Sequence, residues 1–188
     1  MEVGAKRIRE IVLSLRIFSR LDEVEMKEID IHQNIDSTLM ILGHRFKMKA
    51  DGSNIQIVKR YGDLPLIECY AGQLNQVFMN ILSNAIDAVE EAIKHQHIFS
   101  PCITIDTKVI DNQQVAICIS DNGLGIPESV KQRIFDPFFT TKPIGVGTGM
   151  GLAISYQIVK DRHHGELSCV SQPGQGTEFM ITIPLKQN

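Results

Sequence analysis

The stretch GVGTGMGLAIS, residues 145–155, places four glycines at alternate positions directly before a segment that is predicted to be helical. Glycine loses more conformational entropy on folding than any other residue, so such a loop is costly to order but can bring its backbone against a ligand. It is not a Walker P-loop, because Leu152 and Ala153 follow the last glycine where Lys and Ser or Thr are required. A dinucleotide fingerprint requires a strand just before the glycines, and the preceding FDPFFTTKPI has two prolines and no alternation. The loop therefore indicates a phosphate site of another kind.

Composition limits the fold and the classes of partner. A chain of 188 residues with 43% hydrophobic residues can bury one core and carry a small appendage. The formal net charge of −3 disfavours nucleic acid or an anionic membrane as the main partner. No apolar run approaches the roughly 20 residues that span a bilayer, and nothing resembles a signal peptide. The four cysteines are widely spaced in apolar runs, which predicts buried thiols in a reducing compartment.

Two histidine pairs are the candidate transition-metal ligands. His95 with His97, and His163 with His164, are close enough in sequence to share a metal. Exposed polar residues at helix ends explain both pairs more simply, so we expect no metal there.

The N-terminal segment has the pattern of a helix that packs against other helices. Within residues 5–21 the apolar side chains follow a 3-4-3 spacing, and they are Ile8, Ile11, Leu15 and Phe18. Two heptads are too short to be stable alone, so this helix requires a partner, either in a bundle or on the main domain. Residues 22–30 are charged and poorly periodic, which predicts a linker or helix end.

From Asp30 onward the pattern is that of a compact α/β unit. Periodicity predicts helices over about 31–46, 73–94, 128–134 and 152–162, and strands over about 55–60, 66–69, 102–110, 115–120, 166–171 and 178–184. Tight turns join the late strands, which favours antiparallel pairing. We therefore expect an α+β two-layer sandwich, with a mixed, mostly antiparallel sheet covered on one face by about three helices.

The long predicted helix has a polar stripe opposite its apolar side. The stripe consists of Gln73, Gln76, Asn80, Asn84, Asp87 and Glu91. Asparagine is a poor residue for a helix interior, so the two asparagines one turn apart suggest a ligand role. Asn84, helped by Asn80, would offer an amide oxygen to Mg²⁺. From this helix alone, an ordinary solvated face remains the simpler interpretation.

Two glycine turns follow predicted strands. In DNGLGIP, Asp121 ends a strand and would accept a hydrogen bond from the amino group of adenine, whereas guanine would present an oxygen to the carboxylate. An ordinary Asp-Asn-Gly turn explains the same residues. In PGQGTEF a hairpin turn is a sufficient explanation, and only together with the other motifs does Thr177 become a candidate contact to adenine.

The segment FDPFFTTK precedes the glycine-rich loop. Backbone N–H groups from Gly147 to Leu152 would bind phosphate at a helix N-terminus, and Lys142 would contact the terminal phosphate. The three phenylalanines are expected to anchor a lid whose glycines allow it to move on ligand binding.

Taken together, NILSNA, DNGLGIP, FDPFFTTK, GTGMGLAIS and GQGTEF resemble the N, F and glycine boxes of the sensor histidine kinases of two-component signalling. The resemblance runs from about Asp30 to the end of the chain. It implies the Bergerat ATP-binding fold, shared with Hsp90, MutL and gyrase B, with ATP and Mg²⁺ as cofactors. The stretch RIREIVLSLRIFSRLDE resembles the second helix of the dimerisation and histidine-phosphotransfer hairpin. The implied units are residues 1–29, hairpin helix and linker, and residues 30–188, the catalytic ATP-binding domain.

The resemblance also implies site residues. Asn80 and Lys142 would be catalytic, and Asn84 would bind Mg²⁺. The implied cofactor-binding residues are Asn84, Asp87, Asp121, Gly123, Gly125, Ile126, Phe135, Thr141, Gly147, Thr148, Gly149, Met150, Gly151, Leu152 and Thr177.

The family's phosphoacceptor histidine lies on the first hairpin helix, within His-Glu followed shortly by Asn-Pro, and this sequence has no such box. We therefore expect the C-terminal part of a cytoplasmic or membrane-attached kinase. It would transfer the γ-phosphoryl group of ATP to a histidine on another helix, work with a response regulator receiver domain, form a homodimer at full length and bind no nucleic acid. The alternatives are an ATPase like Hsp90, MutL or gyrase B, and a non-catalytic nucleotide-binding scaffold. Those ATPases carry a glutamate one turn before the magnesium asparagine, and Asn80 stands there in this chain.

Overall fold

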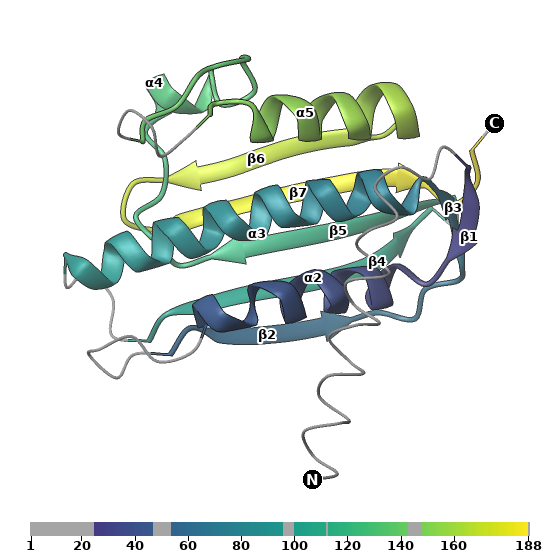
Figure 1. Ribbon diagram of the computed structural model, residues 1–188, viewed down its shortest axis with the longest axis horizontal. Helices are drawn as coiled ribbons and strands as arrows, with labels where there is room; N and C mark the ends of the chain where they lie inside the picture. Colours follow the sequence, from purple (N-terminus) through teal and green to yellow (C-terminus); the bar gives the residue numbers. More distant parts are fainter. Residues whose placement is uncertain (1–24, 47–53, 96–99, 112, 143–147, 188) are drawn as a thin grey trace, which may run out of the picture.

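A mixed five-stranded sheet forms one layer of the fold, and helices cover one of its faces (Figure 1). The computed structural model describes residues 25–46, 54–95, 100–111, 113–142 and 148–187. The predicted first helix at residues 5–21 lies outside these residues. The strands of the large sheet are β2 (Gln56–Tyr61), β4 (Cys102–Ile110), β5 (Gln114–Asp121), β6 (Glu166–Gln172) and β7 (Gly176–Pro184).

The strand order, β2-β4-β5-β7-β6, places two antiparallel hairpins side by side. β4 pairs with β5, and β6 pairs with β7, while β2 is parallel to β4 at the edge. The register between β5 and β7 sets Asp121 opposite Thr177. The end of β5 therefore lies beside the start of β7. The two glycine turns predicted from sequence are thus at the same end of these neighbouring central strands.

The helical layer consists of α2 (Ile31–Phe46), α3 (Ala71–Lys94) and α5 (Gly151–Gln157), which continues into the π-helical turn η2 (Ile158–Arg162). α3 lies across the middle of the sheet in Figure 1, with α2 and α5 on either side. Its apolar side packs on the strands and is fully buried at Leu74, Phe78, Ile81, Leu82, Ile86 and Val89. The predicted two-layer α+β sandwich with about three helices on one face is confirmed.

Residues 27–29 differ from the expectation of a linker. They form β1 (Lys27–Ile29), which pairs antiparallel with β3 (Ile67–Cys69) in a separate two-stranded sheet. Three residues are too few to show a periodic pattern. The extended conformation of β1 therefore depends on its pairing with β3 and not on the local sequence. The boundary at residue 30 between a hairpin unit and a catalytic unit remains a prediction.

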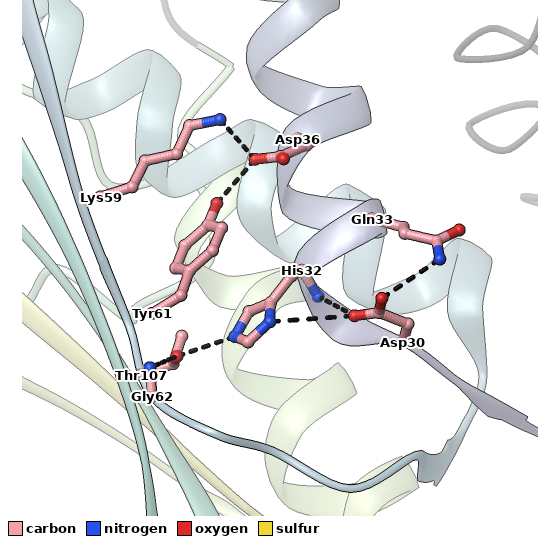
Figure 2. Close-up of polar contacts among 8 residues, drawn as sticks. All are labelled: Asp30, His32, Gln33, Asp36, Lys59, Tyr61, Gly62 and Thr107. Carbon is pink, nitrogen blue, oxygen red and sulfur yellow. Dashed lines mark hydrogen bonds and ion pairs between the residues drawn. The ribbon is translucent and has the colours of Figure 1, made fainter.

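A polar cluster attaches the first turn of α2 to the sheet edge, and Figure 2 shows its contacts. Asp30 Oδ1 accepts a hydrogen bond from the backbone N–H of His32 at 2.9 Å. The His32 ring stacks on Tyr61 with centroids 4.2 Å apart, and its Nε2 lies 2.8 Å from Thr107 Oγ1. Tyr61 donates in turn to Asp36 Oδ1 at 2.7 Å. These contacts join α2 to β2 and β4 and so fix one side of the helical layer.

Three further features bear on the sequence predictions. The helix predicted at 128–134 is only α4 (Glu128–Lys131), followed by turns. The described cysteines are free thiols, and only Cys69 is fully buried, so the expectation of four buried thiols is too broad. Among the described helices, none combines the length and apolarity needed to cross a bilayer.

His163 was expected to be exposed, and this is wrong, because its exposed fraction is 0%. Its Nδ1–H donates to Ile158 O at 2.9 Å, and its Nε2 accepts from the backbone N–H of Tyr70 at 3.1 Å. Burial lowers the pKa of His163, so the ring is neutral in the fold. Tyr70 immediately precedes α3, so His163 ties the end of η2 to the start of α3.

Candidate functional site

One face of α3 contacts three of the segments that the sequence singled out. Asn80, Asn84, Asp87 and Ala88 follow one another at helical spacing along this face. Asn80 contacts the start of α5, Asn84 and Asp87 contact Lys142, and Ala88 contacts the turn after β5. The predicted polar stripe is therefore the surface on which the segments assemble, and an ordinary solvated face does not describe it.

Asn80 holds the first turn of α5. Its Nδ2 donates to the carbonyl oxygen of Gly151 at 2.9 Å and to Ser155 Oγ at 3.1 Å. A Cβ on Gly151 would lie 3.3 Å from Asn80 Cγ, so the absence of a side chain allows this close approach. The amide nitrogen of Asn80 acts as a donor in both contacts, which fixes α5 against α3 just after the glycine-rich loop.

Lys142 belongs to a charged cluster on the next turns of α3. We call Arg45, Asn84, Asp87, Glu90 and Lys142 the Lys142 cluster. The Lys142 ammonium forms an ion pair with Asp87 Oδ2 and donates to Asn84 Oδ1 at 3.2 Å. Arg45, in the last turn of α2, contacts Asp87 Oδ1 at 2.5 Å and Glu90 Oε2 at 3.1 Å. The cluster thus joins α2, α3 and the segment that ends at residue 142.

Electrostatics keep Asp87 ionised. Burial acts to raise the pKa of this carboxyl, but hydrogen bonds from Lys142 and Arg45 outweigh burial and hold the pKa below its usual range. The pKa of Arg45 is raised. Burial acts to lower this pKa, but the contacts with Asp87 and Glu90 outweigh burial. The cluster therefore pairs two basic side chains with two acidic ones, and Asp87 and Arg45 stabilise each other's charged forms.

Asp121 lies at the end of β5 with an exposed fraction of 9%. Its Oδ1 accepts a hydrogen bond from the backbone N–H of Gly123 at 2.8 Å. Burial raises the pKa of Asp121 to about 6, although hydrogen bonds from the backbone N–H groups of Gly123 and Thr177 act in the opposite direction. Near neutral pH the carboxylate is ionised and can accept a further hydrogen bond from a ligand.

The glycines after Asp121 permit close packing. A Cβ on Gly123 would lie 2.6 Å from the carbonyl carbon of Ala88, so only glycine lets this turn touch α3. Gly125 has a φ of +70°, and a Cβ there would collide with the carbonyl oxygen of Gln172. Loop geometry requires both glycines, whether or not a ligand binds beside them.

Ser171 connects the two glycine turns. Its Oγ accepts from the backbone N–H of Ile126 at 2.8 Å and donates to the carbonyl oxygen of Gly176 at 2.9 Å. It also lies 2.9 Å from Thr177 Oγ1. Ile126 and Thr177, both predicted from sequence, are therefore brought together with Asp121 at one edge of the sheet.

The remaining predicted residues lie between the turn of α4 and the start of α5. The rings of Phe135 and Tyr156 pack at 5.1 Å between centroids, whereas Phe138 is 77% exposed. Gly149 has a φ of +66°, and a Cβ there would collide with the backbone of Phe138. Other members of this group are Thr141 and Thr148, which are exposed, Met150 and Leu152, which are partly buried, and Gly147, which lies outside the described residues.

Sequence reasoning missed Arg45, Ser155 and Ser171. Arg45 stands at the C-terminal end of α2, where a basic residue is ordinary, and Ser155 is one residue of a helix. Ser171 occupies an alternating position in a strand. None of these has a local signal, because each acts through a contact with a residue at least 42 positions away.

The donors present fit a divalent cation with phosphates. Among the described residues, no group of three or more His, Cys, Asp and Glu side chains is suited to hold a metal. Asn84 Oδ1 and Asp87 Oδ2 are hard oxygen donors that already bind one cation, the ammonium of Lys142. One amide oxygen, with phosphate and water oxygens, is a donor set that Mg²⁺ uses.

Comparison with known proteins identifies a matching family and similar relatives. Residues 70–187 match the family model described as histidine kinase-, DNA gyrase B- and HSP90-like ATPase. Sporulation kinase E of Bacillus subtilis (strain 168) is 36% identical over 184 residues, which cover 97% of this chain and 23% of that protein. The chain likewise covers 27% of the signal transduction histidine-protein kinase AtoS of Escherichia coli (strain K12), so it spans about a quarter of the length of these two relatives.

Solved structures share this fold. The catalytic domain of histidine kinase ThkA superposes with a TM-score of 0.70 at 26% identity, covering 86% of this chain and 98% of that one. Full-length ShkA in complex with AMPPNP gives a TM-score of 0.70 at 25% identity, covering 93% of this chain and 35% of that one.

Proposed function

Because the chain belongs to the family of histidine kinase-, DNA gyrase B- and HSP90-like ATPases, we propose that it is the ATP-binding catalytic part of a sensor histidine kinase. Its homologues are sensor histidine kinases. The proposed reaction transfers the γ-phosphoryl group of Mg·ATP to an imidazole nitrogen of a histidine on another helix. That nitrogen is itself the nucleophile, so the bond from phosphorus to the bridging oxygen of ADP breaks as the bond to nitrogen forms.

The observation that carries this proposal is the assembly along α3. Asn80, Asn84 and Asp87 contact the beginning of α5 and Lys142, while Asp121 is positioned beside the same helix by the contact of Gly123 with Ala88. A nucleotide can therefore have its base near Asp121 and its phosphates near Asn84. No single motif gives this arrangement, and the alternative of unrelated turns does not explain it.

The base is proposed to be adenine. An ionised Asp121 accepts a hydrogen bond from the exocyclic amino group, while guanine would place a carbonyl oxygen against the carboxylate. Thr177 and Ile126 are held close to Asp121 through Ser171, and they are the proposed neighbours of the base.

Asn84 is the proposed Mg²⁺ ligand. The metal would neutralise phosphate charge and position the terminal phosphate, which is most of what phosphoryl transfer requires. Lys142 is proposed to contact the terminal phosphate, and the backbone N–H groups from residue 147 to Leu152 are proposed to bind phosphate oxygens. Asn80 positions α5 through Gly151 and Ser155.

The rival function is ATP hydrolysis of the Hsp90, MutL and gyrase B kind. Asn80 stands where that class carries the glutamate that polarises water, and its amide cannot accept a proton. Its nitrogen donates to Gly151 and Ser155, which is a positioning contact. The amide at position 80 therefore favours transfer to histidine over fast hydrolysis.

Calorimetric titration with ATP and GTP, with and without Mg²⁺, tests the nucleotide site. ATP should bind with Mg²⁺, and GTP should bind between about five- and 150-fold more weakly, because the mismatch leaves a buried polar clash of roughly 1–3 kcal/mol. Equal affinity for both nucleotides would remove Asp121 from base recognition. A fast steady-state hydrolysis rate would instead favour the rival.

A labelling experiment tests the reaction. The chain is mixed with γ-labelled ATP and Mg²⁺, with and without the separately produced histidine-bearing hairpin of the full-length kinase. Acid-labile label should appear on the hairpin and not on this chain. Label on this chain alone would contradict the assignment of the acceptor to another segment.

The wider setting is also proposed from relatives. A response regulator receiver domain would take the phosphoryl group from the histidine, and the full-length kinase would be a homodimer joined through its hairpins. The domain would work in the cytoplasm, where ATP and Mg²⁺ are supplied.

A further inference from the structure

The Lys142 cluster places a side-chain cation on the atom proposed to bind the metal. Lys142 Nζ lies 3.2 Å from Asn84 Oδ1 and forms an ion pair with Asp87 Oδ2. These two oxygens are the hard donors on this turn of α3. Both belong to residues that the sequence predicted for the nucleotide site, yet in this structure they bind an ammonium from the chain itself.

Lys142 and Mg²⁺ cannot use Asn84 Oδ1 together. The ammonium is already hydrogen-bonded to that oxygen at 3.2 Å, and a divalent ion bound to the same oxygen would stand within a few ångströms of the ammonium. Repulsion between like charges at such a separation is strong in a partly buried site. One of the two cations must leave before the other binds.

We propose that Lys142 is an internal competitor of Mg²⁺, which holds the Asn84 and Asp87 oxygens until Mg·nucleotide displaces it. This inference rests on the proposed function, since it assigns a regulatory contact to the same nucleotide site. Displacement frees the ammonium at the moment when phosphates reach α3. Metal binding and the contact of Lys142 with the terminal phosphate are then coupled steps.

Arg45 makes the exchange possible. After Lys142 leaves, Asp87 remains bound to Arg45 at 2.5 Å, so its carboxylate keeps one cationic partner, and the arriving Mg²⁺ supplies the positive charge that Lys142 takes away. Glu90 Oε2 contacts the same nitrogen of the Arg45 guanidinium at 3.1 Å. Arg45 is therefore a positioning residue that acts through Asp87, and it does not touch the nucleotide.

Mg·ADP separates the two roles of Lys142, because it has the metal but no terminal phosphate. In the Lys142→Met variant the competitor is absent, so Mg·ADP should bind about two- to five-fold more tightly than in the wild type, which is the range for a partly exposed ion pair. Mg·ATP should gain less or lose affinity, since the proposed phosphate contact is lost as well. Lys108→Met, an exposed change of equal charge on β4, should leave both affinities unchanged.

The outcomes distinguish failure of the proposed competition from failure of the proposed nucleotide site. If the wild-type chain binds neither Mg·ADP nor Mg·ATP, the nucleotide site itself is wrong and both proposals fall. If it binds both, and Lys142→Met leaves the affinity for Mg·ADP unchanged or weaker, only the competition is refuted.

A second measurement reports on Lys142 directly. Limited acylation of lysine amines, followed by peptide mass spectrometry, measures how available each amine is. Lys142 should react slowly in the nucleotide-free protein, because its amine is engaged by Asp87 and Asn84. Saturating Mg·ADP should raise its labelling several-fold, with Lys108 unchanged. Equal labelling in both states would overturn the proposed displacement.

Discussion

Lowering the pH from about 7 to about 5 should weaken the binding of adenosine about tenfold, because Asp121 must be ionised to accept from the adenine amino group. The carboxyl is buried, and its pKa is raised to about 6. About nine-tenths of the free protein is then ionised at the higher pH and about one-tenth at the lower pH, a loss of about 1.4 kcal/mol in apparent binding free energy.

Adenosine is the suitable probe, because it carries no phosphate or metal whose own titration would contribute. Calorimetry or a fluorescent competition assay over this pH range gives the affinity. The same raised pKa cannot unfold the protein under these conditions. Since the folded pKa lies above the unfolded value of 3.8, the folded state binds the proton more tightly, and this residue adds stability as the pH falls from about 6 towards 3.8.

The Asp121→Asn variant is the matched control. One amide oxygen cannot serve both the N–H of Gly123 and the adenine, and the amide nitrogen would face a donor in either orientation. Affinity should fall between about five- and 150-fold near neutral pH, and the remaining binding should lose its pH dependence. An unchanged pH profile in this variant, or a flat profile in the wild type, would refute the assignment of Asp121 to the base.

Three other outcomes follow from the structure. Gly123→Ala should cost roughly 1–3 kcal/mol of stability and weaken ATP binding, because the new Cβ would meet Ala88. Gly43→Ala, in open space on α2, should instead add about 0.5–1 kcal/mol of stability. Urea unfolding and calorimetry compare the two variants, and equal effects would contradict the close packing of Gly123 on α3. His163→Phe should cost roughly 2–5 kcal/mol, since it leaves Tyr70 N–H and Ile158 O without their partner. Because the pKa of His163 is lowered, its contribution to wild-type stability is full above the unfolded value of 6.5 and falls as the pH drops below that value. Unfolding curves of the variant should lack this loss, and those of His164→Asn should keep it. ATP hydrolysis by the isolated chain should stay slow in a steady-state phosphate-release assay, because Asn80 cannot activate water, and rapid turnover would show otherwise.

Much of the architecture could be predicted because its signals are local. Period-two alternation predicted the strands of the large sheet, and the apolar side of α3 was visible as a helical stripe. β1 was missed because three residues have no detectable period and owe their conformation to pairing with β3. The π-helical turn η2 was also missed, since it is set by the buried hydrogen bonds of His163 and not by the composition of residues 158–162.

The sequence by itself determined the chemistry that is available: two amides one turn apart on a helix, a carboxylate at a strand end, and glycines where backbone must approach backbone. Each of these is a property of a residue type at a local spacing. Only the tertiary structure decided which of them meet. Lys142 reaches Asn84 across 58 positions, and Ser171 joins Ile126 to Thr177 at the sheet edge. Such contacts arise from strand register and from the packing of α2, α3 and α5 on one face, and the burial and charge pairing that hold the pKa of Asp121 up and that of Asp87 down follow from them.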